Sequence, residues 1–593
     1  MVAKSHKLTN DMDLISVNPD AKFQEIIQKQ NGCKSKNIPA GIAIVIDNKQ
    51  RVIGTITDGD LRRALLTNEN LDFSAKDIMA KNPILFPKEY SYQQILEAIP
   101  SELEKRDRKS RGFLGKIIKI DYDGRPTGIF NYHHLWEQRV AVHRNVAIIG
   151  MGYVGLTLAL GLSEEGFHVT GVDVDKDLIK NLSDGNSHIH EIGIKEILNQ
   201  QLARNLKMST KMPDVGDIYI MCVGTPLNSL QNDKKGPDLS RLLTAAETIG
   251  GRLKSGDLVV LRSTVPPGTT REKILPVLQS KSGLDAGTDF HLSFAPERTI
   301  EGGALEELRS LPQIIGGFNR DSVEATVAIF RELTSNIIRV ESLEDAEFIK
   351  LINNCYRDLS FAFSNQVAQI AQGFNINIVE CIKAANSGYP RDQVPFPSPG
   401  VGGPCLTKDP YFLAFDFKSK SGSKTLSEYG RSINEGMIQY VVDSVLEQFE
   451  KTGKNPLDSQ VLVCGLAFKG DPETTDLRGS SALEIANELK SKVNKVLVHD
   501  PVISCEELES LGFDFAELPT GFKSKDAVLF LNNHSYYKNI NVFNMAKDLR
   551  FPGIIYDGWH LFRHSEILDS HPCVYVGLSF VRSSVNSRSE NKE

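Results

Sequence analysis

The sequence predicts an α/β protein in which two doubly wound parallel sheets are joined by a long central helix and preceded by a smaller α+β module. Apolar strand patterns alternate with helix patterns from residue 145 to about 340, and a second series runs from 460 to 577. Between them, a helix pattern continues from 341 to 372. At roughly 150 residues per domain, 593 residues are enough for several separate cores.

The composition is that of an ordinary globular protein. Apolar residues make up 40% and charged residues 24%, and 68 Lys and Arg against 75 Asp and Glu leave a net charge of −7. This balance excludes a wholly disordered or fibrous chain. It also lacks a general positive field, so we expect no nucleic-acid partner.

Cysteine usage and the longest uncharged run exclude further classes. The 8 cysteines include no CxxC pair, which predicts no metal site and no disulfide framework, and a cytoplasmic location fits best. The N-terminus has no signal-peptide core. The 18-residue uncharged run from Val146 to Ser163 contains four glycines and a phosphate-loop pattern, so we expect no membrane span or membrane partner.

The first predicted domain, residues 8–138, contains an internal repeat. Strand patterns at 41–46 and 52–57 flank a turn, and a helix pattern follows at 60–66. A looser copy has strand patterns at 116–120 and 127–130 around the turn Asp123-Gly124.

The second predicted domain, residues 144–340, begins with a glycine motif. A strand pattern runs into Gly150-Met-Gly152-Tyr153-Val154-Gly155, then a helix, then a strand ending in Asp173. The glycines permit a tight turn, approach of the backbone to a pyrophosphate, and close helix packing, while the helix N-terminus favours phosphate. Asp173 is placed to bind a ribose and would repel the extra phosphate of NADP. The motif therefore predicts a Rossmann-like domain that binds NAD, and the strand ends at Thr225-Pro226 and Thr264 would line the same crevice.

A cysteine stands in an irregular segment after the long helix. The Gly/Pro-rich residues 390–404 lead into Pro404-Cys405-Leu-Thr-Lys408-Asp409. Core cysteines lie inside apolar periodic runs, and Cys405 does not. Since a nearby cation favours the nucleophilic thiolate, Lys408 supports a catalytic role, with a structural loop cysteine as the alternative.

Seven sequence blocks then occur in one order. They are Gly150 to Asp173, Thr225-Pro226, Ser263 to Pro266, Ala295 to Gly302, Lys350 to Asn354, Gly402 to Asp409, and Phe468 to Asp471. In this order the chain, over about residues 144–577, resembles the UDP-glucose/GDP-mannose dehydrogenase family of nucleotide-sugar 6-dehydrogenases. The resemblance implies a central dimerisation domain at 341–417 that carries the cysteine loop, and a Rossmann-like nucleotide-sugar-binding domain at 460–577. The polar composition of 583–593 predicts a disordered tail.

The resemblance implies a four-electron oxidation of a sugar C6 alcohol to a carboxylate with two NAD⁺. Cys405 matches the nucleophile that captures the aldehyde as a thiohemiacetal, which is then oxidised to a thioester. Lys350 matches the lysine that stabilises oxyanion charge, and Asn354 lies one turn later on the same helix face. Asp409 matches the acid that, with a water near Thr264, assists proton transfer in alcohol oxidation.

The same resemblance assigns residues to the substrate. Glu297 matches a glutamate linked to thioester hydrolysis and Glu301 a second glutamate at the substrate pocket. Arg391 resembles an arginine that reaches the nucleotide sugar across a subunit interface, while Lys469 and Arg478 resemble substrate-pocket and domain-contact residues. The predicted substrate-binding residues are thus Glu297, Glu301, Arg391, Gly402, Lys469 and Arg478. The predicted cofactor-binding residues are Gly150, Gly152, Tyr153, Val154, Gly155, Asp173, Lys176, Thr225, Pro226, Thr264 and Glu301.

The sugar is less sharply specified. Asn354-Cys-Tyr-Arg357-Asp358 is similar to the branch that acts on UDP-N-acetylhexosamines, whereas the pair Glu297 and Glu301 fits the UDP-glucose branch equally well. Pro404 before the cysteine departs from the histidine found in some N-acetylmannosamine enzymes. We favour a UDP-N-acetylhexosamine, with UDP-glucose or UDP-galactose types as alternatives.

Residues 8–138 resemble a pair of CBS repeats, a nucleotide-sensing module. The first copy has Gly54-x-x-Thr57-x-x-Asp60, which matches the motif whose threonine and aspartate hold a ribose and a phosphate. In the second copy Asn131 and His134 replace both ligands. The resemblance implies a regulatory adenine- or sugar-nucleotide site at the first copy, with a purely structural dimerisation module as the alternative.

Two other functions remain open at this stage. A two-electron hydroxyacid dehydrogenase would have no use for Cys405, and a non-catalytic nucleotide-sensing scaffold would produce no NADH. The resemblance also implies a homodimer or higher homo-oligomer.

Overall fold

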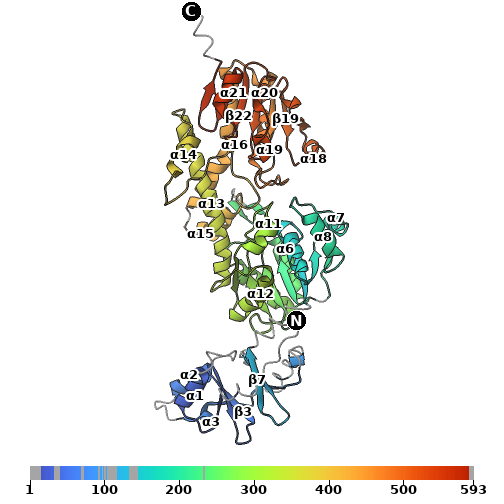
Figure 1. The fold of residues 1–593 in the computed structure, drawn as a ribbon, viewed down its shortest axis with the longest axis vertical. Helices are drawn as coiled ribbons and strands as arrows, with labels where there is room; N and C mark the ends of the chain where they lie inside the picture. The colour runs from blue at the N-terminus through green and yellow to red at the C-terminus, as the bar shows by residue number, and fades with distance from the viewer. Residues whose placement is uncertain are drawn as a thin grey trace, which may run out of the picture. The chain divides into compact units, whose positions relative to one another are not determined.

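The computed structural model describes residues 12, 15–31, 41–67, 73–90, 94–95, 98, 102, 116–131, 144–214, 216–230, 234–421 and 423–585. These residues form two compact units (Figure 1). The first contains the described residues up to Arg144 and two short segments, 285–291 and 319–329, and the second contains the rest. The predicted start of the first domain at residue 8, its predicted end at 138 and the prediction for His134 lie outside the described residues.

The N-terminal module has two sheets with the same local topology. In each, the first strand runs parallel to the second and the second antiparallel to the third, so β1-β2-β3 matches β5-β6-β7. Its elements are β1 (Ser16–Val17), α1 (Phe23–Asn31), β2 (Ile42–Ile46), β3 (Val52–Thr57), α2 (Asp58–Thr67), α3 (Ala75–Ile78), β4 (Ala80–Lys81), β5 (Leu85–Pro87), β6 (Lys116–Ile120) and β7 (Pro126–Asn131).

The two hairpins of this module turn in the same way. Asp47 accepts hydrogen bonds from the N–H groups two and four residues later, and Asp121 does the same in the second hairpin. The N–H of Val52 donates to the carbonyl of Gly124 at 3.0 Å, which joins the two turns. The structure thus contains the predicted internal repeat.

The first large sheet has the strand order of a dinucleotide-binding domain. Its order is β10-β9-β8-β11-β14-β15-β16-β17, so that its first six strands follow the pattern 3-2-1-4-5-6. The elements are β8 (Asn145–Ile149), α6 (Tyr153–Glu164), β9 (His168–Val172), α7 (Lys176–Ser183), α8 (Ile194–Leu202), β10 (Leu206–Ser209), β11 (Ile218–Met221), β12 (Leu227–Leu230), β13 (Lys234–Pro237), α9 (Ser240–Gly250), β14 (Leu258–Leu261), η3 (Thr270–Ile274), α10 (Leu275–Ser282), β15 (His291–Phe294), α11 (Ala304–Ser310), β16 (Gln313–Gly317), α12 (Arg320–Leu333) and β17 (Ile337–Arg339).

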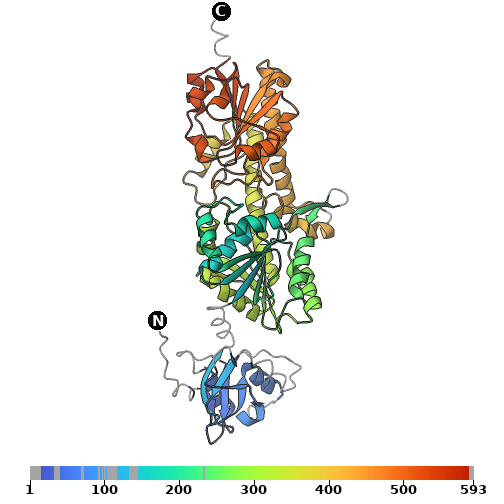
Figure 2. The same ribbon diagram turned by 90° about the vertical axis from the view of Figure 1, so that its right-hand side faces the viewer.

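Two long helices, α13 and α16, follow this sheet and run parallel to each other, since Asp358 contacts Arg431 and Asn365, further along α13, contacts Asn434. Helix α13 (Leu343–Gln372) begins at the capping box of Ser342 and Asp345 and covers the predicted helix pattern. It packs against α16 (Leu426–Lys451), and the two helices run from one large sheet to the other (Figure 2). Along the chain, α13 and α16 are separated by α14 (Ile378–Asn386), the irregular cysteine segment and α15 (Asp409–Ser421).

The second large sheet repeats the doubly wound arrangement. Its order is β20-β19-β18-β21-β22-β23-β24, and its last strand, antiparallel to β23, extends to Ser583, beyond the predicted domain end at 577 and into the predicted tail. Residues 586–593 lie outside the described residues. The elements are η4 (Pro456–Asp458), β18 (Gln460–Cys464), α17 (Ser481–Lys490), β19 (Lys495–His499), α18 (Cys505–Ser510), β20 (Asp514–Phe515), η5 (Thr520–Phe522), β21 (Ala527–Phe530), α19 (Ser535–Lys538), α20 (Val542–Ala546), β22 (Gly553–Asp557), α21 (His564–Ser570), β23 (Cys573–Gly577) and β24 (Val581–Ser583).

Burial explains the continuous apolar runs of the sequence. All residues of β11, β14 and β21 are buried, as expected where helices cover both faces of a parallel sheet. The uncharged run that resembles a membrane span forms β8 and α6 of this core. None of the helices that the structure describes is long and apolar enough to cross a membrane.

Candidate active site

The glycine loop after β8 leaves room for a pyrophosphate. Gly150 has φ +96°, and a Cβ there would lie 2.8 Å from the backbone of Cys222 and Val223. A Cβ on Gly155 would lie 1.8 Å from the carbonyl oxygen of Gly150, so the helix and the loop touch. At Gly152, in contrast, a Cβ would meet nothing within 4 Å. Packing within the protein therefore requires glycine at positions 150 and 155. Gly152, in contrast, borders an open space at the N-terminus of α6, where the pyrophosphate of NAD would fit.

Asp173, at the end of β9, accepts hydrogen bonds that hold the glycine loop in place. Its carboxylate accepts the N–H of Met151 at 2.7 Å and that of Asp175 at 3.1 Å. Lys176 lies exposed in the first turn of α7. The second large sheet uses the same device, because Asp500 at the end of β19 accepts the N–H of Leu466 at 2.8 Å.

The segments that follow β11 and β14 contact each other beside the glycine loop. The hydroxyl of Thr225 is buried and donates to the carbonyl of Thr264 at 2.6 Å, while Pro226 beside it is exposed. A clamp holds the loop after Thr264, because the buried Glu347 on α13 accepts the N–H groups of Gly268 at 2.5 Å and Thr270 at 2.8 Å. Burial raises the pKa of Glu347 to about 7.

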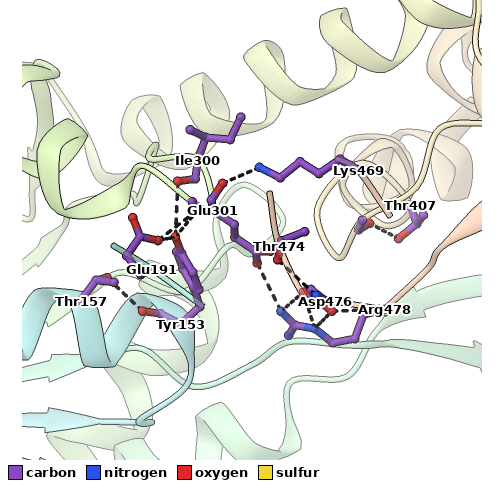
Figure 3. A network of polar contacts seen from close by, with 12 residues as sticks. Tyr153, Thr157, Glu191, Ile300, Glu301, Thr407, Lys469, Thr474, Asp476 and Arg478 are labelled. Atoms are coloured by element: carbon purple, nitrogen blue, oxygen red, sulfur yellow. Dashed lines mark hydrogen bonds and ion pairs between the residues drawn. The ribbon is translucent and has the colours of Figure 1, made fainter. Parts of the chain in front are cut away.

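Tyr153 connects the cofactor loop to the turn that precedes α11 (Figure 3). Its hydroxyl donates to Glu191 and accepts the N–H of Gly302 at 3.0 Å. Glu191 also accepts the N–H groups of Gly302 at 3.0 Å and Ala304 at 2.7 Å. Burial and Glu191 raise the pKa of Tyr153, so the phenol stays protonated. This network places Glu301, the residue before Gly302, beside the cofactor loop.

Glu301 faces the C-terminal domain (Figure 3). Lys469 donates to its backbone carbonyl, and Arg478, held by Asp476, approaches its carboxylate at 3.3 Å. The Oε2 atom of Glu301 is buried without a hydrogen-bond partner among the described residues. Burial and the nearby Asp476 raise the pKa of Glu301 to about 7, against the effect of Arg478 and Lys469. Three predicted substrate residues thus lie together, around a buried carboxylate oxygen that has no hydrogen-bond partner among the described residues.

Glu297 lies deeper and its carboxylate is fully engaged. One oxygen accepts from the guanidinium of Arg262, and the other accepts the N–H groups of Arg298 and Thr299 at 2.7 and 2.8 Å. Burial opposes ionisation, but Arg262, Thr299 and Lys350 together lower the pKa of the Glu297 carboxyl. The side chain is therefore a buried carboxylate.

Cys405 lies among the groups expected to act with it. Asn354 on α13 donates to Asp409 at 2.5 Å, and Lys408 approaches the other oxygen of that carboxylate at 2.8 Å. Asp409 is fully buried, whereas Cys405 is exposed. Desolvation of the sulfur by the surrounding protein raises the pKa of the Cys405 thiol, and the charges of Lys350 and Lys408 oppose this shift. The structure therefore brings the cysteine, the lysine, the asparagine and the aspartate to one site.

The glycines before the cysteine allow its loop to dock on the C-terminal domain. A Cβ on Gly402 would lie 2.4 Å from the carbonyl oxygen of Gly479, and Gly403, at φ +95°, would meet the ring of Phe468. The N–H of Gly403 donates to the Gly479 carbonyl at 3.3 Å. Gly402 therefore has a packing role, whatever it contributes to substrate binding.

Three other predicted residues, Arg391, Thr57 and Asp60, have partners close to them in the sequence. Arg391 is exposed and donates to the hydroxyl of Tyr389 at 3.0 Å. Thr57 and Asp60 bind each other at the start of α2, with 2.7 Å between hydroxyl and carboxylate, and Arg63 pairs with Asp60. This is a helix-capping arrangement, and nucleotide binding there stays a prediction.

Sequence reasoning missed the residues that hold the site in place. Arg262, Glu191 and Glu347 are buried and contact predicted site segments from more distant parts of the chain. Two signals were present in the sequence. Arg262 is a charge directly after an apolar strand, and Glu347 precedes Lys350 by three residues, on the same helix face.

Comparison with known proteins gives four domain matches. The NAD binding domain of the UDP-glucose/GDP-mannose dehydrogenase family matches residues 144–334, its central domain 344–436 and its UDP binding domain 462–564. A CBS domain matches residues 8–67, so the second CBS copy stays a prediction.

Individual relatives match about 70% of this chain. The UDP-N-acetyl-D-mannosamine dehydrogenase of Pyrococcus horikoshii is 32% identical over 427 residues, 71% of this chain and 97% of the relative. The UDP-N-acetyl-D-glucosamine 6-dehydrogenase of Pseudomonas aeruginosa is 31% identical over 418 residues, 70% of this chain and 96% of the relative. The solved structure of UDP-D-ManNAc dehydrogenase from Pyrococcus horikoshii aligns with a TM-score of 0.66 at 31% identity, covering 73% of this chain and 99% of that one.

Proposed function

The chain belongs to the UDP-glucose/GDP-mannose dehydrogenase family and is an NAD-dependent nucleotide-sugar dehydrogenase, and from this premise we propose that it oxidises the C6 alcohol of a UDP-N-acetylhexosamine to a carboxylate. The observation that carries the proposal is the grouping of Cys405, Lys350, Asn354 and Asp409. Relatives named for UDP-N-acetyl-D-mannosamine and UDP-N-acetyl-D-glucosamine support the choice of sugar. UDP-glucose is the alternative substrate.

The proposed chemistry has two oxidations. When bound, NAD⁺ accepts one hydride from C6 in each, so that one alcohol, two NAD⁺ and one water give one carboxylate, two NADH and three protons. In the first, Asp409 takes up the hydroxyl proton through a water held near Thr264. Asn354 orients that carboxylate through its 2.5 Å hydrogen bond.

The second oxidation requires a tetrahedral carbon from which a hydride can leave. The thiolate of Cys405 adds to the aldehyde carbon and forms a C–S bond, and Lys350 stabilises the oxygen anion that results. Loss of hydride gives a thioester, and water then breaks the C–S bond, releases the carboxylate and regenerates the thiol. We assign Glu297 to this last step; its lowered pKa means that it acts as an anion next to Lys350 rather than as an acid.

The substrate is proposed to lie between Glu301, Lys469 and Arg478. The two cations suit the diphosphate of a UDP-sugar, and the unpaired Oε2 of Glu301 suits a sugar hydroxyl. Since these residues come from both large domains, substrate binding would hold the domains together.

We also propose a homodimer. Helix α13 exposes an apolar stripe at helical spacing, with Phe348, Ile352, Tyr356, Phe363 and Ile370 between 43% and 73% exposed. A contiguous apolar stripe of this kind needs a cover, and a second copy of the chain would supply it. The exposed Arg391 would then be available to the other copy.

The experiment that tests the reaction is a count of NADH. UDP-N-acetylglucosamine, UDP-N-acetylmannosamine, UDP-glucose and UDP-galactose are each incubated with excess NAD⁺, and NADH formed per sugar consumed is measured. Two NADH supports the four-electron reaction, one NADH would support the hydroxyacid-type alternative, and no NADH with any sugar would favour the scaffold. The variant Cys405→Ser should stop carboxylate formation and keep NAD affinity within about twofold of the parent, because the thiol is not part of the cofactor loop.

A further inference from the structure

A single buried arginine holds the loop of Cys405 on both sides of the cysteine. Arg431 of α16 is 2% exposed. Its guanidinium donates to the carbonyl of Val401 at 2.8 Å and to the carbonyl of Leu406 at 3.3 Å. The backbone around Cys405 is thus tied to α16, although the cysteine itself is exposed.

The guanidinium is in turn oriented by α13. Asp358 accepts from Arg431 at 2.7 Å and from the side-chain amide of Asn434 at 2.9 Å. Asp358 is fully buried, so this carboxylate has its partners inside the protein and does not contact the sugar. The rigid planar fork of an arginine donates to one carboxylate and two carbonyls in fixed directions, whereas the three donors of a lysine rotate about a single nitrogen.

Helix α13 therefore controls the loop at two points. Lys350, Asn354 and Asp358 follow one another at four-residue intervals and share one helix face. Asn354 binds Asp409 after the cysteine, and Asp358 acts through Arg431 on both flanks. The same face thus carries the proposed oxyanion lysine and the supports of the nucleophile.

We propose that Arg431 is a positioning residue that fixes the thiol of Cys405 relative to Lys350 for the second oxidation, an inference that rests on the proposed function. The ion pair is poorly suited to a purely stabilising role. Arg431 Nε lies 3.6 Å from a carboxylate oxygen of Glu435, which is beyond hydrogen-bond distance, and Asp358 Oδ2 is buried without a hydrogen-bond partner among the residues that the structure describes. A buried pair with unsatisfied atoms contributes little net stability.

The test uses Arg431→Lys, which keeps the charge opposite Asp358 but loses the fork. In single turnovers with the UDP-sugar that gives NADH, we expect the first NADH at the parent rate and the second about 100-fold more slowly, because a displacement of about 1 Å has an effect of this size. KM for the sugar should stay within about twofold of the parent. Backbone amides at 401–409 should exchange with deuterium at least about tenfold faster than in the parent, as expected for a loop released from its support.

Two further variants serve as comparisons for Arg431→Lys. Asp358→Asn should act in the same direction but less strongly, since an amide oxygen still accepts from the guanidinium. Arg563→Lys, at a side chain that is 83% exposed and pairs with Glu566, is the matched control and should change nothing.

Unchanged exchange at 401–409 in Arg431→Lys, equal slowing of both NADH steps, or loss of NAD binding in both Arg431→Lys and Asp358→Asn would overturn the inference. The last two results would make Arg431 a folding residue. If Cys405→Ser still forms two NADH, the proposed function fails instead. If Cys405→Ser stops and Arg431→Lys runs both steps at the parent ratio, only the positioning role fails.

Discussion

Two glycines of the cofactor loop should respond in opposite ways to the same substitution. In Gly155→Ala, the new Cβ would lie 1.8 Å from the carbonyl oxygen of Gly150, so the loop or the helix must move. In Gly152→Ala, the Cβ would meet nothing within 4 Å of the protein and would occupy the space expected for a pyrophosphate. The first change should therefore damage the domain, and the second only its affinity for NAD.

The expected magnitudes follow from the geometry. Relieving the overlap at Gly155 requires a shift of more than about 1 Å against backbone, and overpacking of this kind lowers the free energy of unfolding by about 3 kcal/mol. For a domain of this size that corresponds to a melting temperature about 6–12 °C lower. Gly152 has φ −68° and ψ −163°, which alanine adopts without strain. Its substitution should lower the melting temperature by less than about 3 °C but weaken NAD binding at least tenfold, or about 1.4 kcal/mol.

Thermal denaturation without NAD, followed by calorimetric titration with NAD, measures both quantities. Gly436→Ala is the control, because this exposed glycine of α16 has open space around its Cβ position and should be unchanged or slightly more stable. Equal destabilisation by both loop substitutions, or a Gly155→Ala protein that melts like the parent, would refute this account of the loop.

Three other perturbations have defined outcomes. The Glu301 carboxyl has a pKa of about 7 in the folded protein against an ordinary value of 4.5, so the folded state loses up to about 3 kcal/mol of stability as the pH rises through that interval. The variant Glu301→Gln is neutral at every pH, so it should melt above the parent at pH 8 and no higher than the parent at pH 5. A difference in melting temperature that does not depend on pH would contradict this. Glu347→Gln removes the carboxylate that holds Gly268 and Thr270, so it should lower the stability by about 1–3 kcal/mol in denaturant titrations, whereas an unchanged midpoint would show that the clamp is dispensable. Phe363→Glu introduces a charge into the exposed stripe of α13. If the parent is the proposed dimer, light scattering should report a monomer for this variant, and a dimer of unchanged affinity would place the interface elsewhere.

The local elements could be derived from the sequence, because they depend on short-range periodicity. The strand that ends at Gly150, the helix that begins at Tyr153 and the acid at the end of the next strand all follow the expected pattern. The same holds for the helix from Leu343 to Gln372, whose capping box and apolar spacing are local properties. Family membership and NAD binding follow from such motifs and are supported by the comparisons.

The partners of the site residues are a different matter. Glu297 meets Arg262 across 35 positions, Asn354 meets Asp409 across 55, and Arg431 meets Asp358 across 73. No spacing rule connects residues so far apart, since their encounter depends on how sheet, central helices and loop pack together. The sequence by itself determined the elements and the cofactor loop, and it predicts that Cys405 is reactive. The tertiary structure alone decided which buried charges pair, because a charge inside a protein persists only where packing brings it a partner.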